Sequence, residues 1–218
     1  MRIVITVFCL FFLLLSCKKN RDNMIDISGT VKNAINDQPI AGVQAVLEVK
    51  EMGGNSYSNS FSEIGISLTD TYGQFDFEFE NRNAIEYRLT FNSDNYISKT
   101  TSINPDDLDL AEVNVYNQEI YSWSYLKENI SNSSPFNAAD QIILNFNNMI
   151  VESSGPGSCL TNIISLTGSA ADTTFECQVY GDQTVGYEYF VTKNNSTIQL
   201  NGGVYCPPGD TAICHINY

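Results

Sequence analysis

A strict alternation of apolar and acidic residues in the middle of the chain is the feature that most constrains the fold. Between residues 75 and 80 three phenylalanines alternate with three acids, in the order Phe75-Asp76-Phe77-Glu78-Phe79-Glu80. Successive side chains of a strand point to opposite faces, so this pattern predicts a strand with one buried and one wet face. Similar short runs recur from residue 24 to residue 117, separated by Gly, Asn, Asp and Pro, and no long helical periodicity interrupts them. Short strands with turn signals every ~8–12 residues predict a β-sandwich over residues 24–117.

Three ordered motifs in this region carry a resemblance to a known family. They are Ile27-Ser28-Gly29-Thr30-Val31, Gln38-Pro39-Ile40-Ala41-Gly42-Val43 and Thr69-Asp70-Thr71-Tyr72-Gly73-Gln74-Phe75. Asp70 and Gly73 suit the first and last positions of a type I turn. Together the motifs resemble the carboxypeptidase regulatory-like domain. The resemblance implies a transthyretin-like sandwich of about seven strands that serves as a spacer or docking module. That domain is an accessory part of a peptidase, so the resemblance implies no peptidase activity.

The remaining residues, 118–218, predict a second β domain. Its opening run, Tyr121-Ser122-Trp123-Ser124-Tyr125, places three aromatic residues on one face of a strand. One interpretation is that this face lies in the core, where aromatic side chains are favoured. The alternative is that Tyr121, Trp123 and Tyr125 form a platform on which sugar rings stack.

The N-terminus has the features of an export signal. Arg2 supplies a positive start, and the apolar core from Ile3 to Leu15 is 13 residues long, whereas a membrane-spanning helix needs about 20. A charged start, a short apolar core and a small residue before the break are typical of a secretory signal peptide, here residues 1–16.

The end of this leader, Leu14-Leu15-Ser16-Cys17, resembles the lipobox of bacterial lipoproteins. The resemblance implies that the chain is cut before Cys17, that Cys17 carries the lipid, and that residues 17–23 form a lipidated tether. Several acyl chains would make a durable membrane anchor. Lys18 stands where an Asp commonly retains lipoproteins at the inner membrane, so we expect the outer membrane of a Gram-negative envelope, with the surface or periplasmic side open. The alternative is an uncleaved signal anchor with an unmodified thiol.

Four cysteines remain after Cys9 in the leader and Cys17 are set aside. Cys159, Cys177, Cys206 and Cys214 all lie in the last third of an exported chain, which predicts two disulfides. Four cysteines allow three connectivities, of which we favour Cys159–Cys177 with Cys206–Cys214. A zinc site is the competing interpretation, but the sequence has no Cys-x-x-Cys pair and one histidine.

The charge balance excludes one class of partner. The chain has 11 Lys and Arg against 25 Asp and Glu, a net charge of −14. Nucleic-acid binding needs clustered basic residues, so we expect no nucleic-acid partner. The acidity itself indicates solubility and repulsion from anionic surfaces.

No residues form a recognisable catalytic or metal-binding constellation. Asp106, Asp107 and Asp109 could ligate calcium, but they lack the Gly and the spaced ligands of a dedicated loop and predict a solvated turn. His215 has no Gly-x-Ser-x-Gly elbow to serve. No spacing singles out a pair of carboxylates for glycoside cleavage. We therefore expect no catalytic residues, metal or cofactor.

These observations predict an all-β, two-domain, lipid-anchored envelope protein that acts as a non-catalytic binding, docking or assembly module. Its expected partners are the membrane, through the lipid, and a glycan or an outer-membrane protein. Two alternatives stay open. One is a carboxylate-based, glycan-directed hydrolase in the second domain, and the other is a structural accessory lipoprotein of an outer-membrane transporter.

Overall fold

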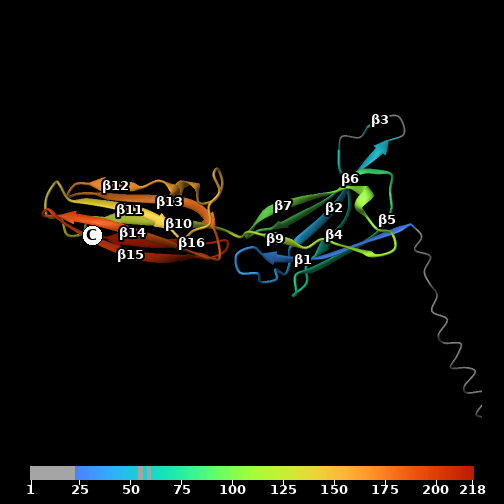
Figure 1. Ribbon diagram of the computed structural model, residues 1–218, viewed down its shortest axis with the longest axis horizontal. Helices are drawn as coiled ribbons and strands as arrows, with labels where there is room; N and C mark the ends of the chain where they lie inside the picture. Colours follow the sequence, from blue (N-terminus) through green and yellow to red (C-terminus); the bar gives the residue numbers. More distant parts are fainter. Residues whose placement is uncertain (1–22, 54–55, 58–59) are drawn as a thin grey trace, which may run out of the picture.

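Strands make up most of the chain in the computed structural model, which describes residues 23–53, 56–57 and 60–218. They form two β-sandwiches that follow each other along the long axis of the molecule (Figure 1). The predicted all-β fold with two sandwiches is confirmed. The leader, Cys17 and the tether up to residue 22 lie outside the described residues.

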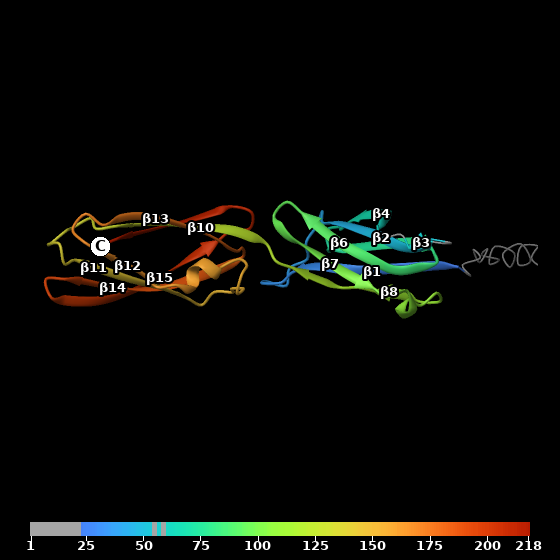
Figure 2. The same ribbon diagram turned by 90° about the horizontal axis from the view of Figure 1, so that it is seen from above.

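The first sandwich is built from two sheets (Figure 2). One sheet has the order β5-β1-β8, and β9 pairs with β1 further along the strand. Its strands are β1 (Met24–Asn33), β5 (Gln74–Glu80), β8 (Val113–Val115) and β9 (Gln118–Ile120). The other sheet has the order β3-β2-β6-β7, with β4 also on β2. Its strands are β2 (Gln44–Gly53), β3 (Ser56–Tyr57), β4 (Ser62–Leu68), β6 (Ala84–Ser93) and β7 (Tyr96–Ile103).

The alternating run that predicted a half-buried strand is β5. Its three phenylalanines are buried in the first core and the residues between them are exposed. The rings of Phe75 and Phe91 meet edge to face with their centroids 5.3 Å apart, a favoured aromatic arrangement. The predicted strand and its buried face are confirmed.

The three motifs that carry the family resemblance meet in space. Val31 donates its backbone N–H to Gly73 O (2.8 Å) and accepts at its carbonyl from Ile40 N (3.0 Å). The buried Thr69 hydroxyl accepts from Val43 N (2.9 Å) and donates to Ile40 O (2.7 Å). Gly73 has a φ of +72°, and a Cβ there would collide with Val31 O, so only glycine fits. The three motifs therefore form one hydrogen-bonded corner of the first sandwich.

The second sandwich also has two sheets, seen as separate layers in Figure 2. The three-stranded sheet has the order β13-β10-β16 and consists of β10 (Trp123–Ser131), β13 (Asp172–Tyr180) and β16 (Thr211–Asn217). The four-stranded sheet has the order β12-β11-β14-β15 and consists of β11 (Gln141–Asn147), β12 (Ile164–Thr167), β14 (Gln183–Lys193) and β15 (Ser196–Cys206). Two short 3-10 helices are η2 (Pro105–Asp107) and η3 (Ser158–Thr161).

The first sandwich extends past the boundary expected at residue 118. Strand β9 pairs in parallel with β1, with Gln118 opposite Val31 and Ile120 opposite Asn33. Ile120 is buried in the first core. The boundary therefore lies after Ile120, because a three-residue strand is held by its distant partner and leaves little local signal.

The disulfide between Cys159 and Cys177 is present and ties η3 to β13, with a Cα–Cα distance of 6.0 Å. The predicted pairing of Cys206 with Cys214 is wrong, since both are free and buried thiols. The loop between them is not a hairpin within one sheet. It carries the chain from β15 in one sheet to β16 in the other, so the two cysteines belong to opposite layers.

Within residues 23–53, 56–57 and 60–218 the structure contains no helix with the length and apolar character that a bilayer span requires.

Candidate functional site

The aromatic stripe at the start of the second domain lies on the outer face of β10 and of the two residues before it. Ser122 and Ser124, which alternate with the aromatic residues, are the fully buried ones. Their hydroxyls have partners inside: Ser122 Oγ donates to Asp182 Oδ2 (2.9 Å) and Ser124 Oγ donates to Asp210 O (2.9 Å). Buried hydroxyls need such partners. The interpretation of this aromatic face as core is therefore wrong.

The three rings are not equally free to bind a ligand. Tyr121 packs on Tyr180 with ring centroids 4.5 Å apart. Trp123 donates its indole Nε1–H to Asp94 O (2.9 Å), in the turn between β6 and β7 of the first sandwich. Tyr125 is 37% exposed and lies edge to face with Trp123, at 5.7 Å between centroids. Tyr125, backed by Trp123, is the part of the stripe that a ligand could reach, and the proposed platform stays a prediction.

A hydrogen-bonded joint connects the two sandwiches at this point, and its centre is the carboxylate of Asp182. Asn33, the last residue of β1, donates its Nδ2–H to Asp182 Oδ2 (2.5 Å). Tyr205 in β15 donates its hydroxyl to Asp182 Oδ1 (3.1 Å). The backbone N–H of Ile97 donates to Tyr121 O (2.8 Å), across the same boundary. With the Ser122 and Trp123 bonds, this joint fixes the second sandwich to the end of the first.

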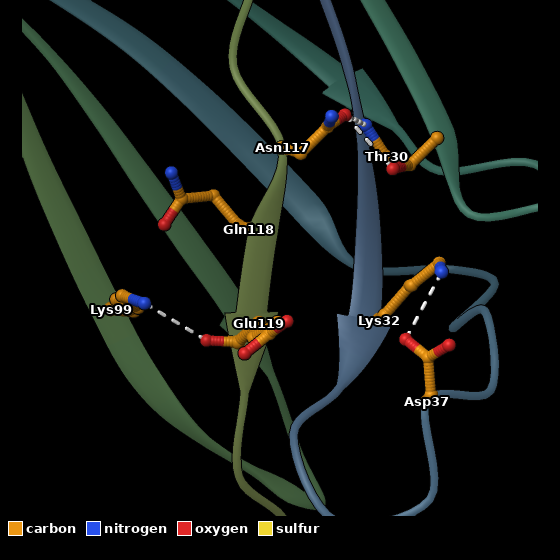
Figure 3. A pocket seen from close by; sticks show the side chains of 7 residues that line it. All are labelled: Thr30, Lys32, Asp37, Lys99, Asn117, Gln118 and Glu119. Carbon is orange, nitrogen blue, oxygen red and sulfur yellow. Dashed lines mark hydrogen bonds and ion pairs between the residues drawn. The ribbon is translucent and has the colours of Figure 1, made fainter.

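An open polar groove of about 420 Å³ lies on the first sandwich where β1, β7 and β9 come together (Figure 3). It is lined by Thr30, Lys32, Asp37, Lys99, Asn117, Gln118 and Glu119. Lys32 Nζ forms an ion pair with Asp37 Oδ1 (3.0 Å), and Lys99 Nζ donates to Glu119 O (3.0 Å). The lining groups thus contact each other, and the groove offers hydrogen-bonding groups to a hydroxyl-rich ligand rather than a reactive arrangement. No pattern in the sequence indicates this groove, because it depends on the pairing of β1 with β9.

A buried carboxyl group lies in the core of the second sandwich. Glu128 on β10 is fully buried, and neither Oε atom has a hydrogen-bond partner in the described part of the chain. It stands opposite Cys214 of β16 in the strand register, and that thiol lies beside it without the geometry of a full hydrogen bond. Burial raises the pKa of Glu128, and the adjacent Cys214 lowers it by less. No substrate can reach this group from solvent.

The two free thiols, Cys206 and Cys214, are buried in the same core as Glu128, and their pKa values are raised. Burial, followed by the charge of Glu128, raises the pKa of Cys206 to about 11. Burial also raises the pKa of Cys214 to about 11. A reactive cysteine needs a lowered pKa and access to solvent. Both thiols are therefore inert as nucleophiles at neutral pH.

The other predicted ligand and catalytic residues are not brought together. Asp106 and Asp107 lie in η2, where Asp106 donates its backbone N–H to Asn104 Oδ1 (3.2 Å), and Asp109 caps the following turn through Ala111 N (2.7 Å). His215 is exposed on β16 beside Asn129, at 3.5 Å between Nδ1 and Nδ2. Across the ranges that the structure describes, no three His, Cys, Asp or Glu side chains are placed to hold a metal ion.

Comparisons with known proteins give no family. No family model matches the chain, and no curated protein matches it. Three similar solved structures are the Bacillus anthracis TIE protein, a streptococcal ancillary pilin and the shaft pilin SpaA from Lactobacillus rhamnosus GG.

All three are distant from this chain. The TIE protein has 11% identity and a TM-score of 0.41 over 90% of this chain and 34% of its own. The ancillary pilin has 14% identity and a TM-score of 0.35 over 91% and 63%. SpaA has 10% identity and a TM-score of 0.31 over 89% and 97%. The chain thus spans about a third of the first protein and just under two thirds of the second, and at these TM-scores no functional conclusion follows.

Proposed function

We propose that this chain is a lipid-anchored protein of a Gram-negative envelope that acts as a non-catalytic binding, docking or assembly module. The observation that carries the proposal is the joint around Asp182, which holds two sandwiches in line. Such a joint makes the first sandwich a stiff spacer, as the family resemblance of residues 24–117 implies. A stiff spacer is useful where one end is tethered and the other must meet a partner.

The direction of the spacer follows from β1. Asn33, its last residue, lies at the joint through its bond to Asp182. Met24, its first residue, is nine residues away, about 30 Å along an extended strand. A lipid on Cys17 would therefore anchor the end of the first sandwich that is far from the joint. The second sandwich would then be the part held furthest from the membrane (Figure 1).

The anchor is tested by replacing the proposed lipid-bearing residue. We expect Cys17→Ala to abolish incorporation of a labelled fatty acid and to move the chain out of the membrane fraction, because the thioether has no other sulfur to form on. Labelling is measured on the protein immunoprecipitated from cells. Cys9→Ala is the matched control, since that cysteine leaves with the leader, and it should label normally. Unchanged labelling of Cys17→Ala would contradict the anchor.

The partner would bind at the exposed end of the aromatic stripe. We expect Tyr125→Ala to lower binding of the chain to its glycan or outer-membrane partner at least about fivefold, since one stacked aromatic ring is worth on the order of 1–3 kcal/mol. Binding is measured on a glycan array and by capture from envelope extracts.

Tyr72→Ala is the control for this prediction. Tyr72 is 71% exposed in the turn between β4 and β5 of the first sandwich and is not part of the stripe, so its removal should leave binding unchanged. Equal binding by wild type and Tyr125→Ala would rule out the platform and leave the docking role to other surfaces.

A further inference from the structure

Strand β15 is a long, exposed edge strand of its sheet. It is 11 residues long, and within the described residues it pairs along its length only with β14. Its sequence, Ser-Thr-Ile-Gln-Leu-Asn-Gly-Gly-Val-Tyr-Cys, contains no charged residue and no proline. Long, flat, uncharged edge strands are the ones that pair with further strands, because their unpaired backbone N–H and C=O groups remain available.

Among the residues that the structure describes, the other long edge strands, with one exception, carry charges that oppose such pairing. The charged edge strands of seven or more residues are β4, β5, β7 and β13. Their charged residues are Glu63 in β4; Asp76, Glu78 and Glu80 in β5; Lys99 in β7; and Asp172 and Glu176 in β13. The exception besides β15 is β16, which lies next to β15 on the same side of the second sandwich and also lacks Asp, Glu, Lys and Arg. These two neighbouring edge strands therefore contribute no formally charged side chain, in a chain whose net charge is −14. The carboxylates nearest to β15 come from adjacent segments and accept hydrogen bonds from its side chains, Glu188 from Gln199 (3.1 Å) and Asp182 from Tyr205 (3.1 Å).

Apolar side chains are exposed along this side. Ile198 is 54% exposed and Leu200 is 41% exposed. They share the face of β15 that, at the other end of the strand, carries the buried Cys206. The core-facing side of β15 is thus covered near Cys206 and uncovered near Ile198, where another strand would add apolar contacts as well as backbone hydrogen bonds.

We propose that β15 pairs with the β15 of a second copy of this chain. Two copies of an acidic chain repel each other over most of their surfaces. The uncharged edge strand β15 is where their backbones can approach without opposing like charges. An edge strand that pairs with its own copy does so through a two-fold axis. We place that axis perpendicular to the sheet, so that the two strands run antiparallel and the core-facing sides of both copies stay on one face of the joined sheet. In such an antiparallel pair, the residues whose backbone N–H and C=O groups bond to the other copy have the same parity in both strands. Ile198 and Leu200 of one copy therefore fall on the same face as those of the other.

The pairing also sets the direction of the two molecules. Strand β15 runs along the long axis of the molecule (Figure 1), so in an antiparallel pair the first sandwiches point in opposite directions. Their N-termini then lie at opposite ends. This step rests on the proposed lipid anchor: if each N-terminus is lipidated, the pair joins copies held in two facing membranes rather than neighbours in one.

Sedimentation velocity of the full chain in detergent, at concentrations up to about 100 µM, tests the pairing. We expect a dimer that Ile198→Lys and Leu200→Lys each convert to monomer, with unchanged circular dichroism because both side chains are exposed. Leu68→Lys is the matched control. Leu68 is 66% exposed on the charged edge strand β4, and this variant should remain dimeric. A monomer at every concentration, or a dimer that both β15 variants retain, would overturn the proposal.

Two further measurements test the direction and separate the pairing from the anchor. Small-angle scattering should give the dimer a greater maximum dimension than the monomer, and an unchanged dimension would overturn the antiparallel arrangement. The Cys17→Ala chain should still dimerise but should fail to cluster phospholipid vesicles, which the lipidated chain clusters. Clustering that persists in Ile198→Lys would show that another surface joins the membranes.

Discussion

Glu128→Met should raise the free energy of unfolding by about 1–3 kcal/mol at pH 7.5, the usual cost of a buried polar or charged group without a partner. Both carboxyl oxygens of Glu128 are buried without a hydrogen bond to any residue that the structure describes, and methionine has a similar length without polar oxygens. Urea denaturation monitored by circular dichroism measures the change. A destabilised variant would show that the carboxyl group has an important partner.

The pH dependence gives a second measurement on the same residue. Burial raises the folded-state pKa of Glu128 above its unfolded value, so folding favours the protonated carboxyl. The destabilising effect of the ionised Glu128 carboxylate is absent below the unfolded-state pKa. It grows as the pH rises from the unfolded-state pKa through the raised folded-state pKa. Between pH 4 and pH 8 the wild type should therefore lose stability relative to Glu128→Gln. Glu176→Gln, an exposed position on the neighbouring strand β13, is the control and should follow the wild type.

Removal of the disulfide should cost about 3 kcal/mol, the loop-closure value for a crosslink of this span. The Cys159–Cys177 bond closes a separation of 18 residues and ties η3 to β13. We expect a Cys159→Ala, Cys177→Ala double variant to shift its urea midpoint downward by the corresponding amount. Dithiothreitol should shift the wild type similarly and leave the double variant unchanged. Equal stability of the wild type with and without the reductant would contradict a structural role for the bond.

The parts of the fold that the sequence predicts are those with a local signal. The alternation around Phe77 identifies both β5 and its buried face, and Asp70 with Gly73 identifies the turn before it. The export signal indicated disulfides among the four C-terminal cysteines but left three connectivities open, and the favoured Cys159–Cys177 pair is present. The anchor at Cys17 falls outside the described residues and stays a prediction.

The parts that were missed depend on contacts between distant residues. Alternation from Tyr121 to Tyr125 alone shows that Trp123 and Ser124 lie on opposite faces, but not which face is inside. Further along β10, Ser124 and Glu128 both share their parity with the buried Leu126 and Ile130. The period-two rule applied to the whole strand was therefore sufficient to indicate that Ser124 and the Glu128 carboxyl group lie inside. It could not show that Asp210 O, 86 residues away, accepts the Ser124 hydroxyl hydrogen.

The parallel pairing of β1 with β8 and β9 determines how the first sandwich would bear a pulling force. A pull between the proposed anchor and the second sandwich would enter at Met24, the first residue of β1, and leave at Ile120, the last residue of β9. The two parallel strands would be drawn past each other along their axes. Their hydrogen bonds would then be strained in shear and break together, whereas a hairpin pulled from its open end breaks them one at a time. Forced unfolding is governed by the unfolding rate, so this topology favours a long lifetime under tension.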